Sequence, residues 1–144
     1  MHPQFPLPDP GDELTRPFWA AAAAGHLAMP RCRRCRGLVW YPEPSCPACG
    51  SPAPAWEPVA GTGTLYTWTV VRHAFLPAFA AAVPFVAGLV ALTEDPAVRL
   101  VTRIVGADPS DLAVDLPMEV TFGELRYEAD GPAVTAPFFR PAAG

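Results

Sequence analysis

Two short stretches, Cys32-Arg33-Arg34-Cys35 and Cys46-Pro47-Ala48-Cys49-Gly50, decide how the N-terminal part of this chain folds. They contain all four cysteines, arranged as two C-x2-C pairs with ten residues between them. A C-x2-C turn directs two thiolates at one ion, and two such turns complete a tetrahedral sulfur site. Gly37 and Gly50 come after the second cysteine of each pair and are expected to supply the positive φ of a tight knuckle. We therefore predict one structural zinc ion, bound by Cys32, Cys35, Cys46 and Cys49 in a zinc ribbon.

Two disulfides or a redox C-x-x-C pair are the alternatives to zinc for these cysteines. The N-terminus lacks the charged and apolar regions of a secretory signal, so we expect a cytoplasmic protein, and disulfides are rare in that compartment. A redox pair would not need a matching second pair. Four cysteine ligands fill every coordination position of the zinc and leave none for a substrate water. The zinc is therefore expected to be structural rather than catalytic.

The composition limits the size of the protein and the class of its partners. The chain has 144 residues, of which 51% are hydrophobic and 17% charged, which fits one compact domain with at most a small appendage. The net charge is -4 and all ten basic residues are arginine, which weighs against a general nucleic-acid binder. A chain this apolar is expected to cover part of its surface with a partner. Its apolar runs are too short for a membrane helix.

One short helix is predicted before the ribbon. Thr15-Arg16-Pro17 is typical of a helix entry, residues 18–24 are rich in alanine, and Gly25 is suited to end the helix. A helix of this length is not stable alone, so it is expected to dock on its own domain or on a partner chain. Within the ribbon, residues 38–42 are predicted to form the strand that returns from the first knuckle.

From residue 61 onward, alternation and turn residues predict five short strands. In the first strand, Tyr66, Trp68 and Val70 are expected to share one face, and Leu65 the other. A single helical turn is predicted at residues 108–112, between the third and fourth strands. This arrangement favours a small, partly open OB-fold barrel, with a generic antiparallel sandwich as the alternative. The predicted strands are residues 61–71, 85–92, 98–105, 118–125 and 136–141.

The predicted fold class is therefore mainly β, with three consecutive parts. Residues 1–26 form an N-terminal tail and the short helix. Residues 27–58 form a rubredoxin-like zinc ribbon, and residues 59–144 form a five-stranded OB-fold barrel.

These motifs together resemble the zinc-ribbon plus OB-fold proteins of domain-of-unknown-function family 35. The resemblance covers residues 18–141. Two places depart from the family pattern, because Glu94-Asp95-Pro96-Ala97 and Asp115-Leu116 stand where a glycine is common, and both are expected to alter loops only. Besides the two cysteine pairs, the matching motifs are Gly25-His26-Leu27, Trp56, Gly61-Thr62-Gly63-Thr64-Leu65-Tyr66, Pro84-Phe85 and Phe139-Arg140-Pro141.

The resemblance implies a function that residue spacing alone does not indicate. Members of this family are usually non-catalytic partners of thiolase-like enzymes, which make or break carbon–carbon bonds in acyl-CoA substrates. The resemblance therefore implies an accessory subunit of such an enzyme, in a hetero-oligomer, with acyl-CoA as a further ligand. In some relatives a similar domain is attached to a hydratase.

The residues themselves offer little catalytic chemistry. All the cysteines are assigned to zinc, no serine stands in a G-x-S-x-G motif, and Gly61-Thr62-Gly63 lacks the rest of a phosphate-binding loop. His73, at the start of an apolar loop, is the histidine placed to touch a substrate or partner, although a lone histidine is more often structural. We therefore expect that the chain is not an enzyme on its own.

The apolar loop itself is the predicted partner contact. Residues 72–84 are long for a connection and nearly free of charge between His73 and Pro84. Phe75, Leu76 and Phe79 are expected to meet the partner enzyme near the mouth of its acyl-CoA channel. The alternative is that the loop folds back and completes the core of its own barrel.

Two sets of arginines are candidates for binding anions. Arg31, Arg33, Arg34 and Arg36 surround the first knuckle, where they either offset the negative zinc–thiolate centre in water or bind CoA phosphates. Arg99 and Arg103 share one face of the third predicted strand. They are candidates to contact CoA, an acidic partner or single-stranded nucleic acid.

Two other functions remain open from the sequence. One is a single-stranded nucleic-acid-binding module, in which Tyr66, Trp68, Arg99 and Arg103 would form a stacking surface. The other is an independent acyl-CoA carrier. The acidic net charge and the apolar loop favour protein–protein contact over both.

Overall fold

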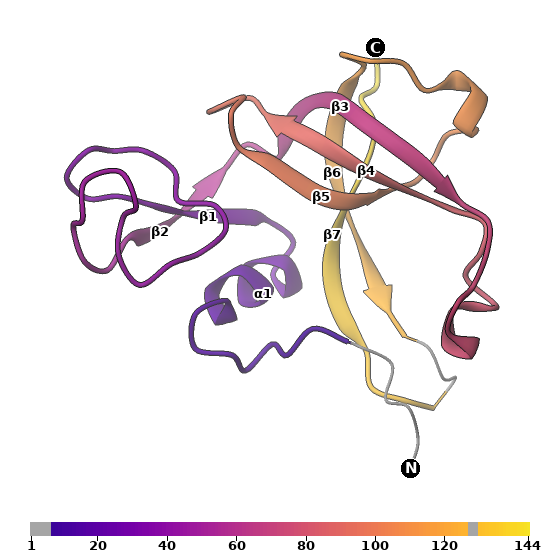
Figure 1. The fold of residues 1–144 in the computed structure, drawn as a ribbon, viewed down its shortest axis with the longest axis horizontal. Helices are drawn as coiled ribbons and strands as arrows, with labels where there is room; N and C mark the ends of the chain where they lie inside the picture. The colour runs from indigo at the N-terminus through magenta and orange to yellow at the C-terminus, as the bar shows by residue number, and fades with distance from the viewer. Residues whose placement is uncertain (1–6, 127–129) are drawn as a thin grey trace.

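The computed structural model describes residues 7–126 and 130–144, so the first six residues of the predicted tail lie outside it. A small ribbon domain stands at one end of the long axis, a β-barrel at the other, and a helix between them (Figure 1). The elements in chain order are α1 (Arg16–Ala23), β1 (Leu27–Arg31), β2 (Ala55–Val59), β3 (Thr62–Val71), η1 (Pro77–Phe79), β4 (Phe85–Leu92), β5 (Arg99–Ile104), η2 (Pro109–Asp111), β6 (Pro117–Leu125) and β7 (Val134–Pro141).

Helix α1 forms where it is predicted and docks on its own chain. Pro17 lies in its first turn, and Gly25 follows its end with a φ of 85°. Phe18 and Ala22 are buried, and the helix packs against both β1 and β7. The helix therefore joins the ribbon to the barrel. No helix among the described residues is long and apolar enough to cross a membrane.

The ribbon is framed by two antiparallel strands, β1 and β2, which pair from Leu27↔Val59 to Arg31↔Ala55. The predicted returning strand at residues 38–42 is wrong, because Leu38 makes only an isolated bridge with Arg31. The knuckles use the backbone of this region for turns, and the prolines there lack the N–H that a strand ladder needs. The strand that pairs with β1 therefore comes after the second knuckle.

The remaining five strands close into a barrel in the order β3-β4-β5-β7-β6, with β6 returning to β3. This strand order confirms the OB-fold and excludes the antiparallel sandwich, and the barrel is closed where a partly open one is predicted. The junction between β5 and β7 is parallel and short, with Ile104↔Phe139 as its ladder pair. There the buried Thr102 hydroxyl donates to the Pro137 carbonyl oxygen at 3.1 Å, which adds a bond across the seam.

A bulge in β3 corrects the predicted strand faces. Pairing with β4 shifts register between Leu65 and Thr67, which leaves Tyr66 as the extra residue. Leu65 is fully buried and Trp68 packs against the core, whereas Tyr66 is 45% exposed. Tyr66 and Trp68 therefore do not share a face, because one inserted residue reverses the alternation.

One hydrophobic core spans the barrel, the helix and the first ribbon strand. Phe139, Leu65 and Val90 from the barrel are fully buried in the same cluster as Phe18 of α1 and Met29 of β1. The residues around the metal site form a second, smaller cluster with Val39. The predicted division at residues 26 and 58 remains a prediction, and the continuous core indicates that β1 is anchored by the barrel.

Candidate metal centre and interaction surfaces

The two cysteine knuckles have the same backbone design. The Cys32 N–H donates to the Gly37 carbonyl at 2.8 Å, and the Arg36 N–H donates back to the Cys32 carbonyl at 3.0 Å. In the second knuckle, Cys46 and Ser51 take the first of these roles, and the Gly50 N–H donates to the Cys46 carbonyl, both at 2.8 Å. These paired bonds close each turn tightly and direct its two thiols to one side.

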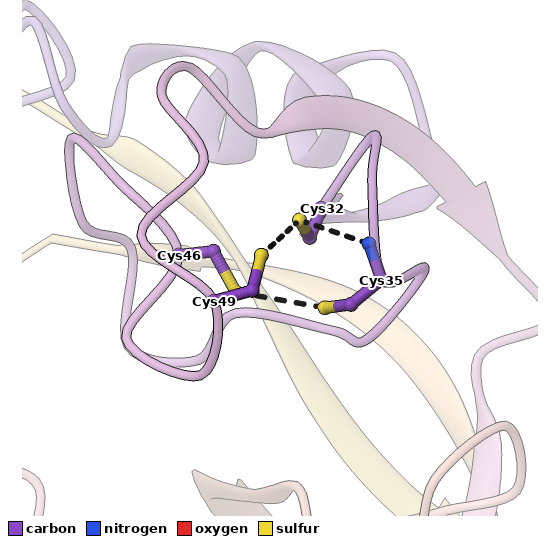
Figure 2. A group of neighbouring side chains, drawn as sticks. All are labelled: Cys32, Cys35, Cys46 and Cys49. Carbon is purple, nitrogen blue, oxygen red and sulfur yellow. Dashed lines mark hydrogen bonds between the residues drawn. The ribbon is translucent and has the colours of Figure 1, made fainter.

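The four sulfurs converge on one point, as Figure 2 shows. All four ligand atoms lie within 4.8 Å of one another, with Cys32 Sγ 3.5 Å from Cys49 Sγ and Cys35 Sγ 3.7 Å from Cys46 Sγ. A tetrahedral zinc with bonds of about 2.3 Å places its sulfurs roughly 3.8 Å apart. The donor set and its spacing therefore fit a four-thiolate zinc ion.

The sulfurs also have hydrogen bonds suited to thiolates. The backbone N–H groups of Cys35 and Arg34 each donate to Cys32 Sγ at 3.4 Å. The Cys35 N–H is the main cause that lowers the pKa of the Cys32 thiol to about 6, and burial opposes it. The Gly37 N–H lowers the pKa of Cys35, but the neighbouring thiols Cys32 and Cys46 outweigh it and raise that pKa to about 11. Without a metal the cluster therefore retains protons, which a bound divalent cation would displace.

The predicted role of Gly37 as the knuckle glycine is wrong. The residue with positive φ in the first knuckle is Arg36, at 64°, whereas Gly50 has the corresponding conformation at 75° in the second. Gly37 lies one position later and is not among the residues with positive φ. The sequence signal of a glycine near the second cysteine therefore identified the right residue in only one knuckle.

The arginines around the first knuckle are mostly engaged. Glu57 of β2 accepts from Arg31 Nε at 3.0 Å and from Arg36 Nη2 at 3.2 Å. Arg33 Nε donates to the carbonyl of Ala53 in the other knuckle at 3.2 Å. Within residues 7–126 and 130–144, Arg34 is the member of this set whose guanidinium has no hydrogen bond or ion pair. Arg31 and Arg36 are therefore paired within the chain, and phosphate binding by Arg33 and Arg34 stays a prediction.

The apolar loop between β3 and β4 is divided between an exposed and a packed part. Phe75 is 89% exposed and Leu76 is also exposed, and the exposed His73 ring contacts the Phe75 ring edge-on at 4.6 Å. Phe79 instead stacks on Phe85 of β4, with ring centroids 6.4 Å apart. The loop therefore folds back at Phe79 and presents Phe75 to solvent.

Arg99 and Arg103 share one face of β5, as predicted, and each covers an aromatic ring. The Arg99 guanidinium carbon is 3.9 Å from the centre of the Tyr66 ring. That of Arg103 is 4.6 Å from the Phe85 ring and 5.6 Å from the Phe138 ring. Arg103 also borders a shallow pocket of about 150 Å³ beneath the apolar loop.

The predicted contact residues do not form one site. The knuckles with Arg33 and Arg34 lie at one end of the long axis, whereas the β3–β4 loop with η1 lies at the other end, beyond the barrel (Figure 1). The loop and the knuckle arginines therefore belong to separate surfaces of the chain.

Two family models match this chain. Residues 19–55 match the rubredoxin-like zinc ribbon domain of ChsH2, and residues 56–123 match the C-terminal OB-fold domain of ChsH2. The zinc-ribbon match and the four converging sulfurs agree, so the cysteines form one structural zinc site.

Curated relatives include proteins with different names. A probable enoyl-CoA hydratase alpha subunit from Thermomonospora curvata is 39% identical over 143 residues. That match covers 97% of this chain but 41% of the relative, so the chain spans less than half of that protein. A DUF35 domain-containing scaffold protein from Methanocaldococcus jannaschii is 29% identical over 77% of this chain and 78% of its own length.

Solved structures agree with the fold. A chain of the Ltp2-ChsH2(DUF35) aldolase superposes with a TM-score of 0.78 and 34% identity, covering 94% of this chain and all of that chain. A DUF35 protein from Sulfolobus solfataricus has a TM-score of 0.59 at 10% identity, over 91% of this chain and 87% of its own, which shows the fold alone.

Proposed function

The chain belongs to the DUF35 family of proteins with a zinc ribbon and an OB-fold, and from this membership we propose that it is a non-catalytic subunit of a thiolase-like enzyme that acts on acyl-CoA. The observation that carries the proposal is the 34% identity to a chain of the Ltp2-ChsH2(DUF35) aldolase, which extends over that entire chain. The Methanocaldococcus jannaschii relative named as a scaffold protein supports the same assignment.

The chemistry of the described residues supports an accessory role. The metal site is built from four cysteines, which fill all positions of a tetrahedral ion and leave none for a substrate. The zinc therefore stabilises the ribbon, and the reacting groups belong to the partner enzyme.

We further propose that the exposed part of the β3–β4 loop meets the partner near its acyl-CoA channel. Phe75 and Leu76 are apolar and exposed, and such residues gain most when a partner covers them. His73 lies beside Phe75 and would face the same junction. Arg33 and Arg34 lie at the other end of the molecule, and we propose that they bind a separate anion, such as the phosphate of a CoA held by another subunit.

The hydratase relative supports a second candidate of the same class. Because the match to the Thermomonospora curvata protein covers 97% of this chain at 39% identity, a hydratase subunit is an alternative partner. The two candidates differ in the enzyme that binds, and not in the accessory role of this chain.

The nucleic-acid alternative loses its geometric basis. Trp68 is turned into the core by the bulge, and the Arg99 guanidinium covers one face of the Tyr66 ring. A base would have to displace that arginine to stack on this face of the ring.

The proposal is tested by co-expression with thiolase-like enzymes of the same genome, beginning with any in a neighbouring reading frame, followed by size-exclusion chromatography and assay of carbon–carbon bond cleavage or formation. We expect a stable complex, and partner activity that falls when this chain is omitted. Enoyl-CoA hydratase subunits of the same genome are tested in the same way. If neither enzyme binds, or if the partner is equally active alone, the accessory role is wrong.

A further inference from the structure

We propose that the outer face of β4 and β5, opposite the barrel core, docks an acidic-rimmed apolar patch on the partner enzyme. This inference rests on the proposed function and adds a second contact surface to the loop. The docking face is defined by Tyr66, Phe85, Leu89, Arg99, Val101 and Arg103.

The centre of the docking face is apolar and open. Val101 is 58% exposed, and it pairs across the ladder with Leu89 of β4, so the two side chains lie together on the outside of the barrel. Its neighbours on the same strand face are Arg99 and Arg103, two residues away on either side. At about 3.3 Å per residue, these two arginines are roughly 13 Å apart. An apolar centre with arginines at its rim is the usual composition of a protein interface.

Both arginines are held in place before any partner arrives. The Arg99 guanidinium lies 3.9 Å from the centre of the Tyr66 ring, and that of Arg103 lies over the rings of Phe85 and Phe138. Long side chains normally lose rotamer freedom when an interface forms, and that loss opposes binding. The aromatic supports have already reduced this freedom, so these guanidiniums are preorganised to meet carboxylates.

The charge of the face indicates an acidic partner. In the described part of the chain, neither Arg99 nor Arg103 has an ion pair, although the protein as a whole carries a net charge of -4. Two carboxylates in this region have other partners: Glu124 lines the same pocket as Arg103, and Glu94 lies in the connection between β4 and β5. Glu94 accepts from the Ala60 N–H at 2.6 Å, and Glu124 is 3.5 Å from Arg126. Two unpaired cations on an acidic protein favour carboxylates from outside.

A second copy of this chain fits the face less well. A two-fold interface brings the same patch of both subunits together. Here it would set Arg99 and Arg103 against the same arginines of the other copy, and like charges in contact oppose association. The complementary occupant is therefore a different protein with carboxylates around an apolar centre.

The test uses this chain and a separately purified thiolase-like enzyme with which it forms a complex, with affinity measured by surface plasmon resonance at several salt concentrations. Val101→Glu should weaken the complex at least tenfold, because it buries a carboxylate against the apolar centre of the partner's patch, within its ring of acidic residues. Arg99→Gln combined with Arg103→Gln should slow association and flatten its salt dependence. Val114→Glu, at a 64% exposed valine outside the docking face, is the matched control and should bind like the wild type.

The outcomes separate this inference from the proposed function. If the wild type binds and Val101→Glu binds equally well, the docking face is wrong while the accessory role stands. If the wild type does not bind at all, both are wrong. Sedimentation of the isolated protein gives a third check, because a wild-type dimer that Val101→Glu dissociates would identify a second copy as the occupant and overturn the inference.

Discussion

Arg36 and Gly50 occupy equivalent positions in the two zinc knuckles. Each follows the second cysteine of its pair, has a positive φ (64° and 75°), and donates its N–H to the carbonyl of the first cysteine. An arginine in this conformation is strained, but its side chain reaches Glu57 of β2 and ties the knuckle to the ribbon sheet. In the first knuckle, the contact of Arg36 with Glu57 thus offsets the strain that a glycine at this position would avoid.

Gly37 and Gly50 both come shortly after the second cysteine of a knuckle, but only Gly50 occupies the position with positive φ. Gly50→Ala should lower the free energy of unfolding by about 1 kcal/mol, because alanine is strained at a φ of 75° even though nothing lies within 4 Å of its Cβ. Gly37→Ala should cost less, since its φ is not positive and its Cβ would meet Cys35 Sγ at an ordinary 3.6 Å. Urea denaturation of the zinc-loaded variants measures both. Equal losses would contradict the assignment of the knuckle position.

The position of the zinc site predicts which segment of the chain needs the metal to stay folded. Purified protein should contain one zinc per chain, and a chelator or Cys49→Ser should unfold the segment between β1 and β2, because the metal stabilises the small cluster around Val39. The barrel should persist, since its core is separate and includes β1. Hydrogen exchange before and after chelation, with zinc added back as the control, distinguishes local from global unfolding.

Acid should release the zinc, because its ligands are thiolates that become protonated as the pH falls. Zinc binds thiolates, and each thiol that gains a proton as the pH falls loses its ability to bind. Cys35, whose pKa in the metal-free cluster is raised to about 11, has the strongest tendency to regain its proton. We therefore expect zinc to be retained at neutral pH and lost on acidification, as followed with a zinc-sensitive dye. Zinc retained in strong acid would show that the four sulfurs are not its ligands.

The seam between β5 and β7 includes one side-chain hydrogen bond in addition to its backbone pairing. Thr102→Val keeps the shape of the residue but removes the hydroxyl that donates to the Pro137 carbonyl, and leaves that oxygen without this donor. The cost should be about 1–3 kcal/mol, as for a buried polar group left unsatisfied. Thr69→Val, on the exposed side of β3, is the control and should change stability little. Thermal melts of both variants measure the difference.

Most of the fold follows from local patterns in the sequence. The cysteine spacing predicts the ribbon, and period-two alternation predicts the barrel strands to within about two residues. These signals are local, because each depends on residues close together in the chain. What they miss depends on pairing across the structure, as with β2, whose strand partner lies more than twenty residues earlier.

The errors have specific physical causes. The bulge at Tyr66 arises from how β3 pairs with β4, and no residue type within β3 marks it. For the same reason the stacking surface of Tyr66 and Trp68 was wrong, since one inserted residue moves every later side chain to the other face. The ion pairs of Arg31 and Arg36 with Glu57 link positions over twenty residues apart, so the arginine run alone does not reveal which members are free.

The β3–β4 loop gives a prediction that separates binding from stability. Phe75 is 89% exposed, so Phe75→Ala should leave the melting temperature and the zinc content unchanged. If Phe75 is buried by the partner, the same change should weaken the complex by roughly 1.5–3 kcal/mol, the value of fully burying such a side chain. Phe79→Ala is the contrasting variant: Phe79 stacks on Phe85, so its loss should lower the melting temperature.

A variant of His73 in the same loop tests whether this chain touches the substrate. His73 contacts Phe75 edge-on, so a loop buried at the junction with the partner would carry the imidazole toward the acyl-CoA channel. His73→Ala that assembles normally but lowers turnover would place the loop against substrate, whereas unchanged turnover would limit the loop to assembly. If Phe75→Ala binds the partner as tightly as the wild type, the loop is not the interface. Aromatic residues are among the strongest contacts of protein interfaces, so removing a buried aromatic ring from an interface should measurably lower the binding affinity.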